Sequence, residues 1–392
     1  MTDQGPGFLG YPRPDGRVGV RNHVLVVPTV ICASVVAERI AAAIAPIGTP
    51  LPHLAGCGQL GPDLRVTHDT LAAYCRHPNV GAVLVVALGC EQVVAQYLAD
   101  TARASGKPAA IVAIQTEGGT LRATDRGIEI ARGMARDLAH VERTWCAASS
   151  LTLSVKCGGS DYTSGLASNP VLGRVADHLV DLGGSVVLGE IAEIMGAEHV
   201  LAERATSPAM AARLIRVIGR VETEAMALGL DIRGTQPSPG NIRGGLTTIE
   251  EKSLGATHKA GERTRLEDVV SYAAPITRKG LTVMDTPGLD VESVTGMVGG
   301  GAQIVVFTTG LGTPTGNPIA PVIKITGNAR TAKTMADNLD LDVSGVIGES
   351  EPFSAAADRL FASVLAVSSG APTAAERLGH REFAIHRRNP TI

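Results

Sequence analysis

The chain has 392 residues, which is too long for one compact core and predicts roughly two or three domains. A net charge of −3 without any long basic run argues against a nucleic-acid partner. No apolar stretch reaches the roughly 18 residues of a membrane helix, and the first residues lack the charged and apolar regions of a signal peptide. We therefore expect a soluble, cytoplasmic protein without a membrane partner.

The first third of the chain alternates apolar runs with helical segments after a Pro/Gly-rich arm at residues 1–14. Strands are predicted at 23–30, 80–88 and 109–114, and helices at 34–45, 69–76, 92–104 and 120–141. Strands without polar alternation, each followed by a helix, indicate a parallel sheet covered on both faces. Residues 15–147 are therefore predicted to form a doubly wound, Rossmann-like α/β domain.

The remainder, residues 148–392, is predicted to be a second α/β domain that carries the catalytic groups on glycine-rich loops. Strands are predicted at 152–155, 185–188, 280–284, 303–307 and 321–326, and helices at 171–182, 204–228 and 355–368. The segment 236–261 is too polar and too rich in glycine for a core. It is interpreted as a linker or as a loop that faces the substrate.

A candidate site follows the apolar run that ends at Lys156 and Cys157. The next residues offer a thiol, the Asp161 carboxylate, several hydroxyl groups and three glycines. Loops at the carboxyl ends of strands hold the sites of α/β folds, because the sheet fixes them while their backbone donors remain free.

Three of the six cysteines follow apolar runs and stand next to glycine: Cys57, Cys90 and Cys157. A thiol near a helix N-terminus has a lowered pKa, which favours the thiolate that binds metal or attacks electrophiles. The alternative is a small buried apolar residue, which is our interpretation of Cys75 and Cys146. Three thiolates would suit iron, as a single ion or a cluster. A thiol nucleophile, or no catalysis at all, is equally compatible with the residues.

Two later loops have features of ligand sites. The D-x-x-G of MDTPG has no accompanying phosphate-binding loop, so a nucleotide site is excluded. TTGLGTPTGNP is interpreted as a backbone nest, including Gly310 and Gly312, that could hold a carboxylate or another small anion, or as an ordinary tight turn. Lys324 interrupts an apolar strand and must pair or point into a cavity. Glu190 and Glu193 lie three residues apart and would share a helix face, either functionally or as first-turn acids.

Long motifs in the chain resemble the altronate/galactarate dehydratase family, which includes the large subunit of sulfolactate sulfo-lyase. They include GYPRPDGRVGVRN at 10–22, KCGGSDYTSGLASNP at 156–170, GEIAEIMGAEHVL at 189–201 and PSPGNIRGGLTTIEEKSLGA at 237–256. The resemblance implies iron-dependent β-elimination from a small hydroxy acid, yielding a 2-keto-3-deoxy acid from sugar acids. In such chemistry the metal acidifies the α-proton, a base removes it, and a second group protonates the leaving oxygen.

The resemblance also implies roles for individual residues. The iron ligands would be Cys57, Cys90 and Cys157, with Cys32 as a fourth thiol. Lys252 is the first choice for the base, and His53 is its competitor. The expected catalytic residues are Lys252, Asp161, His53 and Lys324, and the expected substrate-binding residues are Ser160, Asn241, Thr309, Gly310 and Gly312. The alternatives are an ion-paired surface role for Lys252 and a packing role for His53.

Two departures from the family pattern affect the expected partners and substrate. Full-length members carry a small N-terminal domain, whereas about nine residues precede the first motif here. We therefore expect a separate small subunit or a missing domain, as well as a homo-oligomer. Asn338 replaces an acid of the family's DDMD motif. Three functions follow: an iron-dependent dehydratase, a two-subunit lyase that eliminates sulfite from sulfolactate or a similar acid, and a non-catalytic subunit that binds metal or acids.

Overall fold

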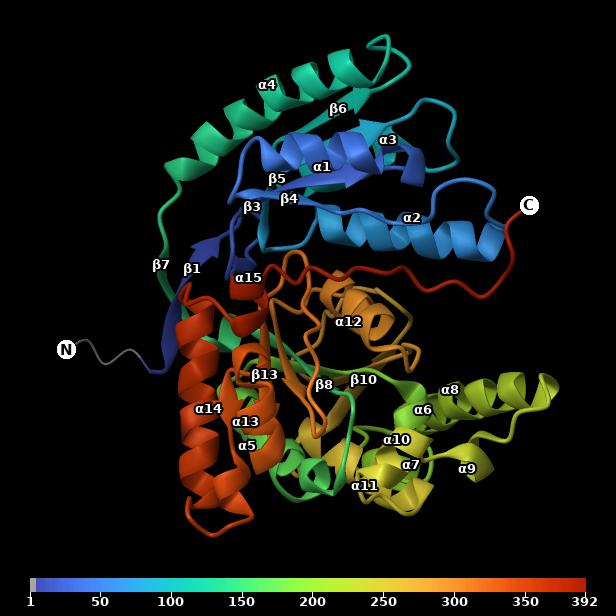
Figure 1. Ribbon diagram of the computed structural model, residues 1–392, viewed down its shortest axis with the longest axis vertical. Helices are drawn as coiled ribbons and strands as arrows, with labels where there is room; N and C mark the ends of the chain where they lie inside the picture. Colours follow the sequence, from blue (N-terminus) through green and yellow to red (C-terminus); the bar gives the residue numbers. More distant parts are fainter. Residues whose placement is uncertain (1–4) are drawn as a thin grey trace.

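The computed structural model describes residues 5–392 and contains two parallel sheets packed through a shared layer of helices (Figure 1). A four-stranded sheet has the order β4-β3-β5-β6, and a seven-stranded sheet has the order β10-β11-β9-β8-β12-β13-β14. All the strand pairs in both sheets are parallel. The predicted α/β class, with a first parallel-sheet unit followed by a second one, is confirmed.

The four-stranded sheet is covered on both faces, as its continuous apolar strands predict. Its strands are β3 (His23–Pro28), β4 (Gly48–Pro50), β5 (Val80–Ala87) and β6 (Ala109–Ala113). Its helices are α1 (Ser34–Ala42), α2 (Gly61–Cys75), α3 (Ala95–Ala104) and α4 (Thr120–Ala139). Val24 and Val26 of β3 pack in the same core as residues of α1 and α4, whereas Leu25 and Val27 face α2 and α3.

The seven-stranded sheet has β8 at its centre, between β9 and β12. Its strands are β8 (Thr152–Cys157), β9 (Ser185–Leu188), β10 (Leu266–Val270), β11 (Gly280–Met284), β12 (Ile304–Thr308), β13 (Val322–Thr326) and β14 (Leu341–Asp342). The main helices on its two faces are α5 (Asn169–Asp181), α12 (Asp290–Gly299) and α14 (Phe353–Ser368). Val294 and Val298 of α12 share an apolar core with Leu71 of α2, so the two sheets are joined through these helices.

The predicted N-terminal arm is partly a strand, which corrects the sequence interpretation. Strand β1 (Gly7–Pro12) pairs with β2 (Val18–Gly19) and with β7 (Thr144–Ala147) in an antiparallel sheet. Residues 1–4 of the arm lie outside the described residues. Such short strands depend on pairing with distant segments, which local sequence patterns do not reveal.

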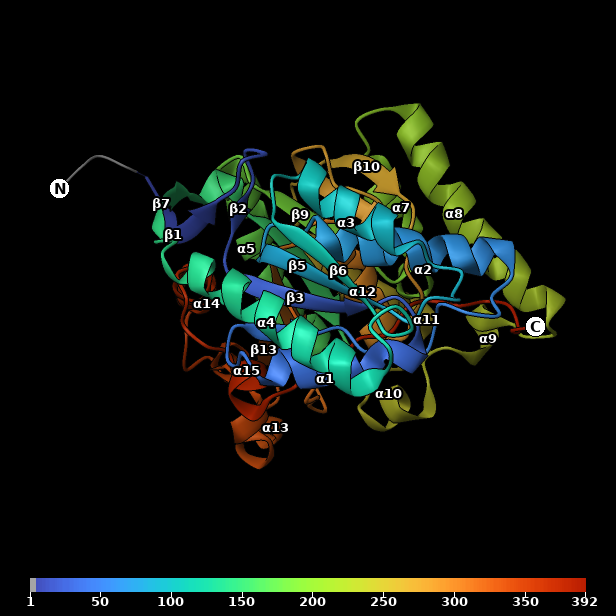
Figure 2. The same cartoon turned by 90° about the horizontal axis from the view of Figure 1, so that it is seen from above.

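The segment 236–261 is mostly helical rather than a linker or a loop, but it does face a cavity, which Lys252 and His258 line. It forms α10 (Pro239–Arg243), α11 (Ile249–Thr257) and the short turn η4 (His258–Ala260). The hydroxyls of Ser238 and Thr248 cap α10 and α11 by accepting hydrogen bonds from backbone N–H groups. These helices lie with α8 (Pro208–Ala227) at one side of the seven-stranded sheet (Figures 1 and 2).

The C-terminal residues return to the first sheet after α15 (Ala374–Leu378). The Phe383 ring packs against the Tyr74 ring at 4.9 Å, and the Ile392 N–H donates to the Gly58 carbonyl at 2.8 Å. Figure 1 shows this red segment running between the two units. None of the helices between residues 5 and 392 combines the length and apolar character that a bilayer crossing requires.

Candidate active site

Adjacent parallel strands bring charged residues together at the carboxyl edge of the seven-stranded sheet. Val155 of β8 lies opposite Leu188 of β9, so Lys156 and Cys157 end one strand beside the turn that contains Glu190. Glu190 has a φ of +65°, a left-handed conformation that is uncommon outside glycine. Its N–H donates to the Thr286 hydroxyl at 2.7 Å. Such strained residues concentrate at functional sites.

Lys156 is fully buried and holds two carboxylates. Its ammonium is ion-paired with Glu190, and it lies 2.6 Å from Asp290 Oδ1 and 5.1 Å from the centre of the Phe307 ring. Burial alone would lower the pKa of Lys156, but the neighbouring carboxylates of Glu190, Glu193 and Asp290 raise it above its usual value. Lys156 is therefore a permanent cation beneath the site.

A second buried lysine connects Cys157 and Glu193. Lys259 Nζ lies 2.7 Å from Cys157 Sγ and 3.1 Å from Glu193 Oε2, and the Cys157 thiol donates to Glu193 Oε2 at 3.0 Å. Burial, reinforced by Glu193, raises the pKa of Cys157 to about 12, so the thiolate expected from the sequence is not favoured. Because Lys156 and Lys259 stand beside several acids, we call these residues the charged cluster: Lys156, Cys157, Glu190, Glu193, Lys259 and Asp290.

The two glutamates of the charged cluster have opposite electrostatic environments. Burial and the neighbouring Glu193 raise the pKa of Glu190 well above its ordinary value. Burial would also raise the pKa of Glu193, but Lys259 and Lys156 outweigh it and hold that pKa well below the usual range. Glu193 is thus ionised, whereas the buried Glu190 depends on the neighbouring Lys156 and Lys259 ammoniums for its negative charge.

Part of the charged cluster has the residue types of a metal site. Cys157, Glu190 and Glu193 each offer one potential ligand atom, and these three atoms lie within 4.8 Å of one another. No other group of three such residues among residues 5–392 meets this condition. Glu190 Oε2 is buried and has no hydrogen-bond partner within the described chain. One sulfur and two carboxylates suit a divalent transition metal, including iron. The Lys259 ammonium competes for the same sulfur.

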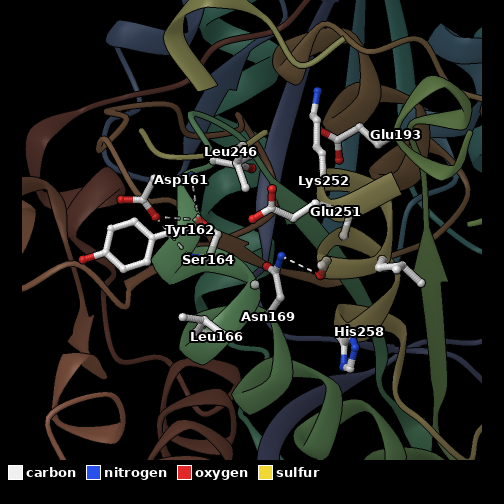
Figure 3. Close-up of a pocket in the computed structure, with 15 residues that line it drawn as sticks. Asp161, Tyr162, Ser164, Leu166, Asn169, Glu193, Leu246, Glu251, Lys252 and His258 are labelled. Atoms are coloured by element: carbon white, nitrogen blue, oxygen red, sulfur yellow. Dashed lines mark hydrogen bonds between the residues drawn. The ribbon is translucent and has the colours of Figure 1, made fainter. Parts of the chain in front are cut away.

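Glu193 also faces a cavity of about 260 Å³, where its side chain is 12% exposed. Figure 3 shows Glu193 and Lys252 on one side of this cavity and Asp161 with Tyr162 on the other. The lining residues are Ser160, Asp161, Tyr162, Ser164, Gly165, Leu166, Asn169, Glu193, Leu246, Glu251, Lys252, Leu254, Gly255, Ala256 and His258. The predicted residues Lys252, Asp161 and Ser160 therefore meet in one cavity. Lys252 Nζ donates to Gln236 Oε1 at 2.9 Å.

Asp161 organises the loop after β8. Its carboxylate accepts hydrogen bonds from the Thr163 hydroxyl at 2.6 Å, the Ser164 N–H at 3.1 Å and Asn328 Nδ2 at 2.7 Å. A Cβ at Gly310 would lie 2.2 Å from this carboxylate, so only glycine allows the loop after β12 to approach it. Because both carboxylate oxygens accept hydrogen bonds, Asp161 fixes the wall of the cavity rather than exchanging protons.

A second cavity of about 410 Å³ adjoins the first and shares Asp161 and Tyr162 with it. Two arginines line it, Arg243 at the end of α10 and Arg330 in α13 (Ala329–Thr334). Neither guanidinium donates to or pairs with another residue in the described part of the chain. Arginine forks bind carboxylates and related oxyanions, so this cavity suits an acid group.

The predicted backbone nest is not available to a ligand. The N–H groups of Gly310 and Leu311 both donate to the Gly159 carbonyl, and the Gly312 N–H donates to the Thr309 hydroxyl at 2.9 Å. These donors hold the loop itself, which corrects the sequence interpretation of Thr309, Gly310 and Gly312. Asn241 likewise forms hydrogen bonds within the protein.

Asn241 supports the cavity from behind. Its Nδ2 donates to the Ser160 carbonyl at 2.8 Å, and its Oδ1 accepts from the Ser238 hydroxyl at 2.8 Å. It thereby fixes Ser160, which lines the cavity itself. Asn241 is a positioning residue in this structure.

His53 and Lys324 lie apart from this cavity. His53 Nε2 lies 2.8 Å from the Pro28 carbonyl, and its Nδ1 accepts the Ala55 N–H at 3.2 Å, so both ring nitrogens are engaged. Lys324 Nζ donates to the carbonyls of Pro314 at 2.7 Å and Thr315 at 3.2 Å. Burial lowers the pKa of Lys324 to about 8, yet the side chain fixes a loop. Neither residue is placed for the catalytic role expected from the sequence.

The predicted thiol ligands are divided between the two sheets. Cys32, Cys57 and Cys90 are exposed on loops of the first unit, whereas Cys157 is buried in the second. The three loops are neighbours, since the Ile31 N–H donates to the Ala55 carbonyl and the Gln92 N–H to the Gly56 carbonyl, both at 3.1 Å. None of these three thiols joins Cys157 in a three-ligand group within the described range. Iron bound by Cys57, Cys90 and Cys157 together stays a prediction without geometric support.

Several residues of the charged cluster were not selected from the sequence. Lys156 and Lys259 are the two buried ammoniums, and Asp290 lies at the start of α12. A lysine inside an apolar strand is the signal that singled out Lys324, and it applies equally to Lys156. The spacing of Glu190 and Glu193 predicts a shared helix face, but it is equally compatible with first-turn acids.

Comparison with known proteins agrees with this architecture. Residues 10–139 match the second domain of D-galactarate dehydratase/altronate hydrolase, and residues 148–391 match the C-terminal domain of D-galactarate/altronate dehydratase. The (2R)-sulfolactate sulfo-lyase subunit beta of Chromohalobacter salexigens is 40% identical, over 99% of both chains. The altronate dehydratase of Bacillus subtilis is 33% identical over 98% of this chain and 78% of its own, and the galactarate dehydratase (L-threo-forming) of Escherichia coli is 31% identical over 99% and 78%. All three relatives are lyases by name. The chain belongs to the D-galactarate/altronate dehydratase family.

Proposed function

We propose that this protein is a lyase that removes a proton and a leaving group from adjacent carbons of a small hydroxy acid. The observation that carries the proposal is the position of Glu193, which connects the buried charged cluster to the cavity that contains Lys252. Two oppositely charged side chains on one wall provide a proton acceptor and a proton donor for the reaction.

The reaction breaks two bonds of the substrate. A base takes the proton from C2, the electron pair of that C–H bond forms the C2=C3 double bond, and the group on C3 leaves with its bonding electrons. Protonation of a leaving hydroxyl gives water, whereas a sulfonate leaves as sulfite. The resulting enol rearranges to a 2-keto acid.

The roles of Glu193 and Lys252 depend on whether a metal occupies the charged cluster. Cys157, Glu190 and Glu193 would hold a divalent ion such as iron, which would withdraw electrons from the substrate's carboxylate. Glu193 is then engaged, and Lys252 is the base, as the sequence predicted. Without a metal, the ionised Glu193 accepts the proton and the Lys252 ammonium donates one to the leaving group. Metal analysis of anaerobically purified protein separates these two cases.

The adjoining cavity accounts for an acid group of the substrate. Arg243 and Arg330, whose guanidiniums have no partner among residues 5–392, line a space that shares Asp161 and Tyr162 with the catalytic cavity. A carboxylate or sulfonate bound there would leave its neighbouring carbons between the two cavities. Substrates with an anionic group next to the reacting carbons are therefore the best fit.

A two-subunit enzyme that eliminates sulfite is the second candidate. The chain covers 99% of a relative named as a subunit beta, but only 78% of the dehydratases. Residues 10–139 match a region that is described as a second domain. In this candidate a separate subunit would complete the enzyme, as the name subunit beta implies for the relative.

Product analysis with a panel of acids tests both candidates. The chain is purified anaerobically, with ferrous iron or with a chelator, and assayed alone and with a co-expressed small subunit on altronate, galactarate and sulfolactate. A 2-keto-3-deoxy acid supports the dehydratase, and sulfite together with pyruvate supports the sulfo-lyase. Folded, iron-loaded protein that yields neither product with either partner arrangement refutes both and favours a non-catalytic subunit.

A further inference from the structure

A third cavity, of about 600 Å³, lies at the amino edge of the seven-stranded sheet. Thr152 at the start of β8, Ser185 at the start of β9 and Gln303 just before β12 line it. Cys157 and the charged cluster stand at the opposite ends of the same strands. This cavity is therefore separate from the proposed catalytic site.

Both family domains contribute cations to this cavity. Arg17 and Arg76 come from the first domain, and Arg278 and Lys279 come from the second. No carboxylate is among its lining residues in the described chain. Because the whole chain has 38 acidic and 35 basic residues, composition does not explain four cations without a lining acid.

The arginines from the first domain are incompletely paired. The half-buried Arg76 guanidinium has no hydrogen-bond or ion-pair partner among residues 5–392. Arg17 pairs with Asp15 at 2.6 Å and donates from Nη2 to the Arg76 carbonyl at 2.5 Å, which leaves its Nη1 without a partner in the described structure. Burial, and then the neighbouring Arg17, lower the pKa of Arg76. Two neighbouring guanidiniums therefore keep open hydrogen-bond donors within the described structure.

The cations from the second domain bind mainly backbone oxygens. Lys279 Nζ donates to the Ser149 carbonyl at 2.5 Å, and Arg278 Nη1 donates to the Glu267 carbonyl at 3.2 Å. The Arg278 guanidinium also lies 3.8 Å from Asp268, an acid beside the cavity. The hydroxyls of Ser149, Ser150 and Thr277 line the same space and could donate to a bound oxyanion.

The negative C-terminal ends of the neighbouring helices do not balance all four cations. The C-terminal ends of α2 and α12 reach the cavity at Arg76 and Gly300, and each carries about half a unit of negative charge. Together with the Asp15 and Asp268 carboxylates, these ends leave a surplus of about one positive charge, even when both helix dipoles are fully counted. The remaining positive charge favours an anionic ligand.

We propose that this cavity binds a small molecule carrying a phosphate group, which bridges the two family domains. Arginine forks, a lysine point charge and several hydroxyls are the donors that phosphate oxygens accept. The ligand would hold Arg76 of one domain against Lys279 of the other. This inference does not depend on the proposed function, whose acid groups bind at the opposite edge.

Calorimetric titration with inorganic phosphate and with pyrophosphate, at constant ionic strength, tests the proposal. The variants are Arg76→Gln and Lys279→Gln. Because Lys279 is exposed, its substitution should leave folding unchanged. Each variant should weaken binding about tenfold or more, the cost of a charged hydrogen bond. The exposed Arg132→Gln in α4 is the matched control and should bind like the wild type. Arg243→Gln should also bind normally.

Citrate distinguishes a phosphate site from a general polyanion site. Tighter binding of citrate than of pyrophosphate, lost in Arg76→Gln, would overturn the phosphate assignment. No binding of either phosphate ligand to the wild type up to about 10 mM would overturn the site. Binding that is lost in Arg243→Gln but kept in Lys279→Gln would move the anion to the catalytic edge and also overturn it.

Discussion

The substitution Lys156→Met is expected to destabilise the protein strongly. Lys156 is fully buried and neutralises Glu190, which is 1% exposed, as well as the partly exposed Asp290. Removing one partner of a buried ion pair leaves an uncompensated charge and costs about 3–5 kcal/mol. Methionine nearly preserves the volume, so little of that loss arises from a cavity. The change is a large part of a typical stability of about 5–15 kcal/mol.

Urea unfolding followed by far-ultraviolet circular dichroism measures this loss. The matched control is Lys333→Met, an exposed lysine in α13, which should stay within about 0.5 kcal/mol of the wild type. The double variant Lys156→Met/Glu190→Gln should recover part of the loss, because it removes both buried charges. A Lys156→Met protein within about 1 kcal/mol of the wild type would refute the reasoning that the charged cluster is held by its ion pairs.

Two further outcomes follow from buried backbone and side-chain contacts. Burial, and then the neighbouring Arg17, lower the pKa of Lys107 to about 6, below its value in the unfolded chain. Between about pH 6 and 10 the unfolded chain therefore binds a proton that the folded protein does not. The stability of the wild type should rise over this range by up to about 1.4 kcal/mol per pH unit. Urea unfolding at pH 6.5 and pH 9 should show this rise, and Lys107→Met should remove it; an unchanged slope would contradict the burial effect. Gly173→Ala in α5 places a Cβ 2.0 Å from the His258 carbonyl and should lower the Tm, whereas Gly219→Ala in α8 meets nothing within 4 Å and should raise it. Equal shifts of the Tm in both alanine variants would contradict the close contact.

The sequence predicts the parallel sheets because their strands are continuous apolar runs separated by helices. β5 is buried at every position, and such a run has few alternatives in an α/β protein. β1 and β7 were missed, since they pair with each other across more than a hundred residues of sequence. The short helices α10 and α11 were missed because hydroxyl caps outweigh their glycine-rich composition.

The site was predictable where one loop carries it and unpredictable where two sheets must meet. Ser160 and Asp161 follow β8 directly, so their place at its carboxyl edge follows from strand order alone. Cys57 and Cys90 also follow strands, but these belong to the other sheet. Local patterns do not tell which sheet edges come together in space. That is why the three-thiol hypothesis failed to anticipate the glutamates beside Cys157.

Lys156 and Lys324 show the same limit for a single residue type. Each interrupts an apolar strand and must satisfy a buried ammonium. Lys156 meets carboxylates at the charged cluster, whereas the Lys324 ammonium donates to the carbonyls of a loop. The sequence indicates that each lysine has partners, and tertiary contacts determine whether those partners can do chemistry.

Elimination rates of Glu193→Gln and Lys252→Gln decide whether the cavity beside the charged cluster is the catalytic site. Each variant should lower kcat by about 100-fold or more, because each removes a group that transfers a proton or holds the reacting centre. Arg132→Gln should keep the wild-type rate, and Lys252→Gln should keep the wild-type Tm. If both cavity variants turn over substrate within about threefold of the wild type, proton transfer occurs elsewhere and the assignment is wrong.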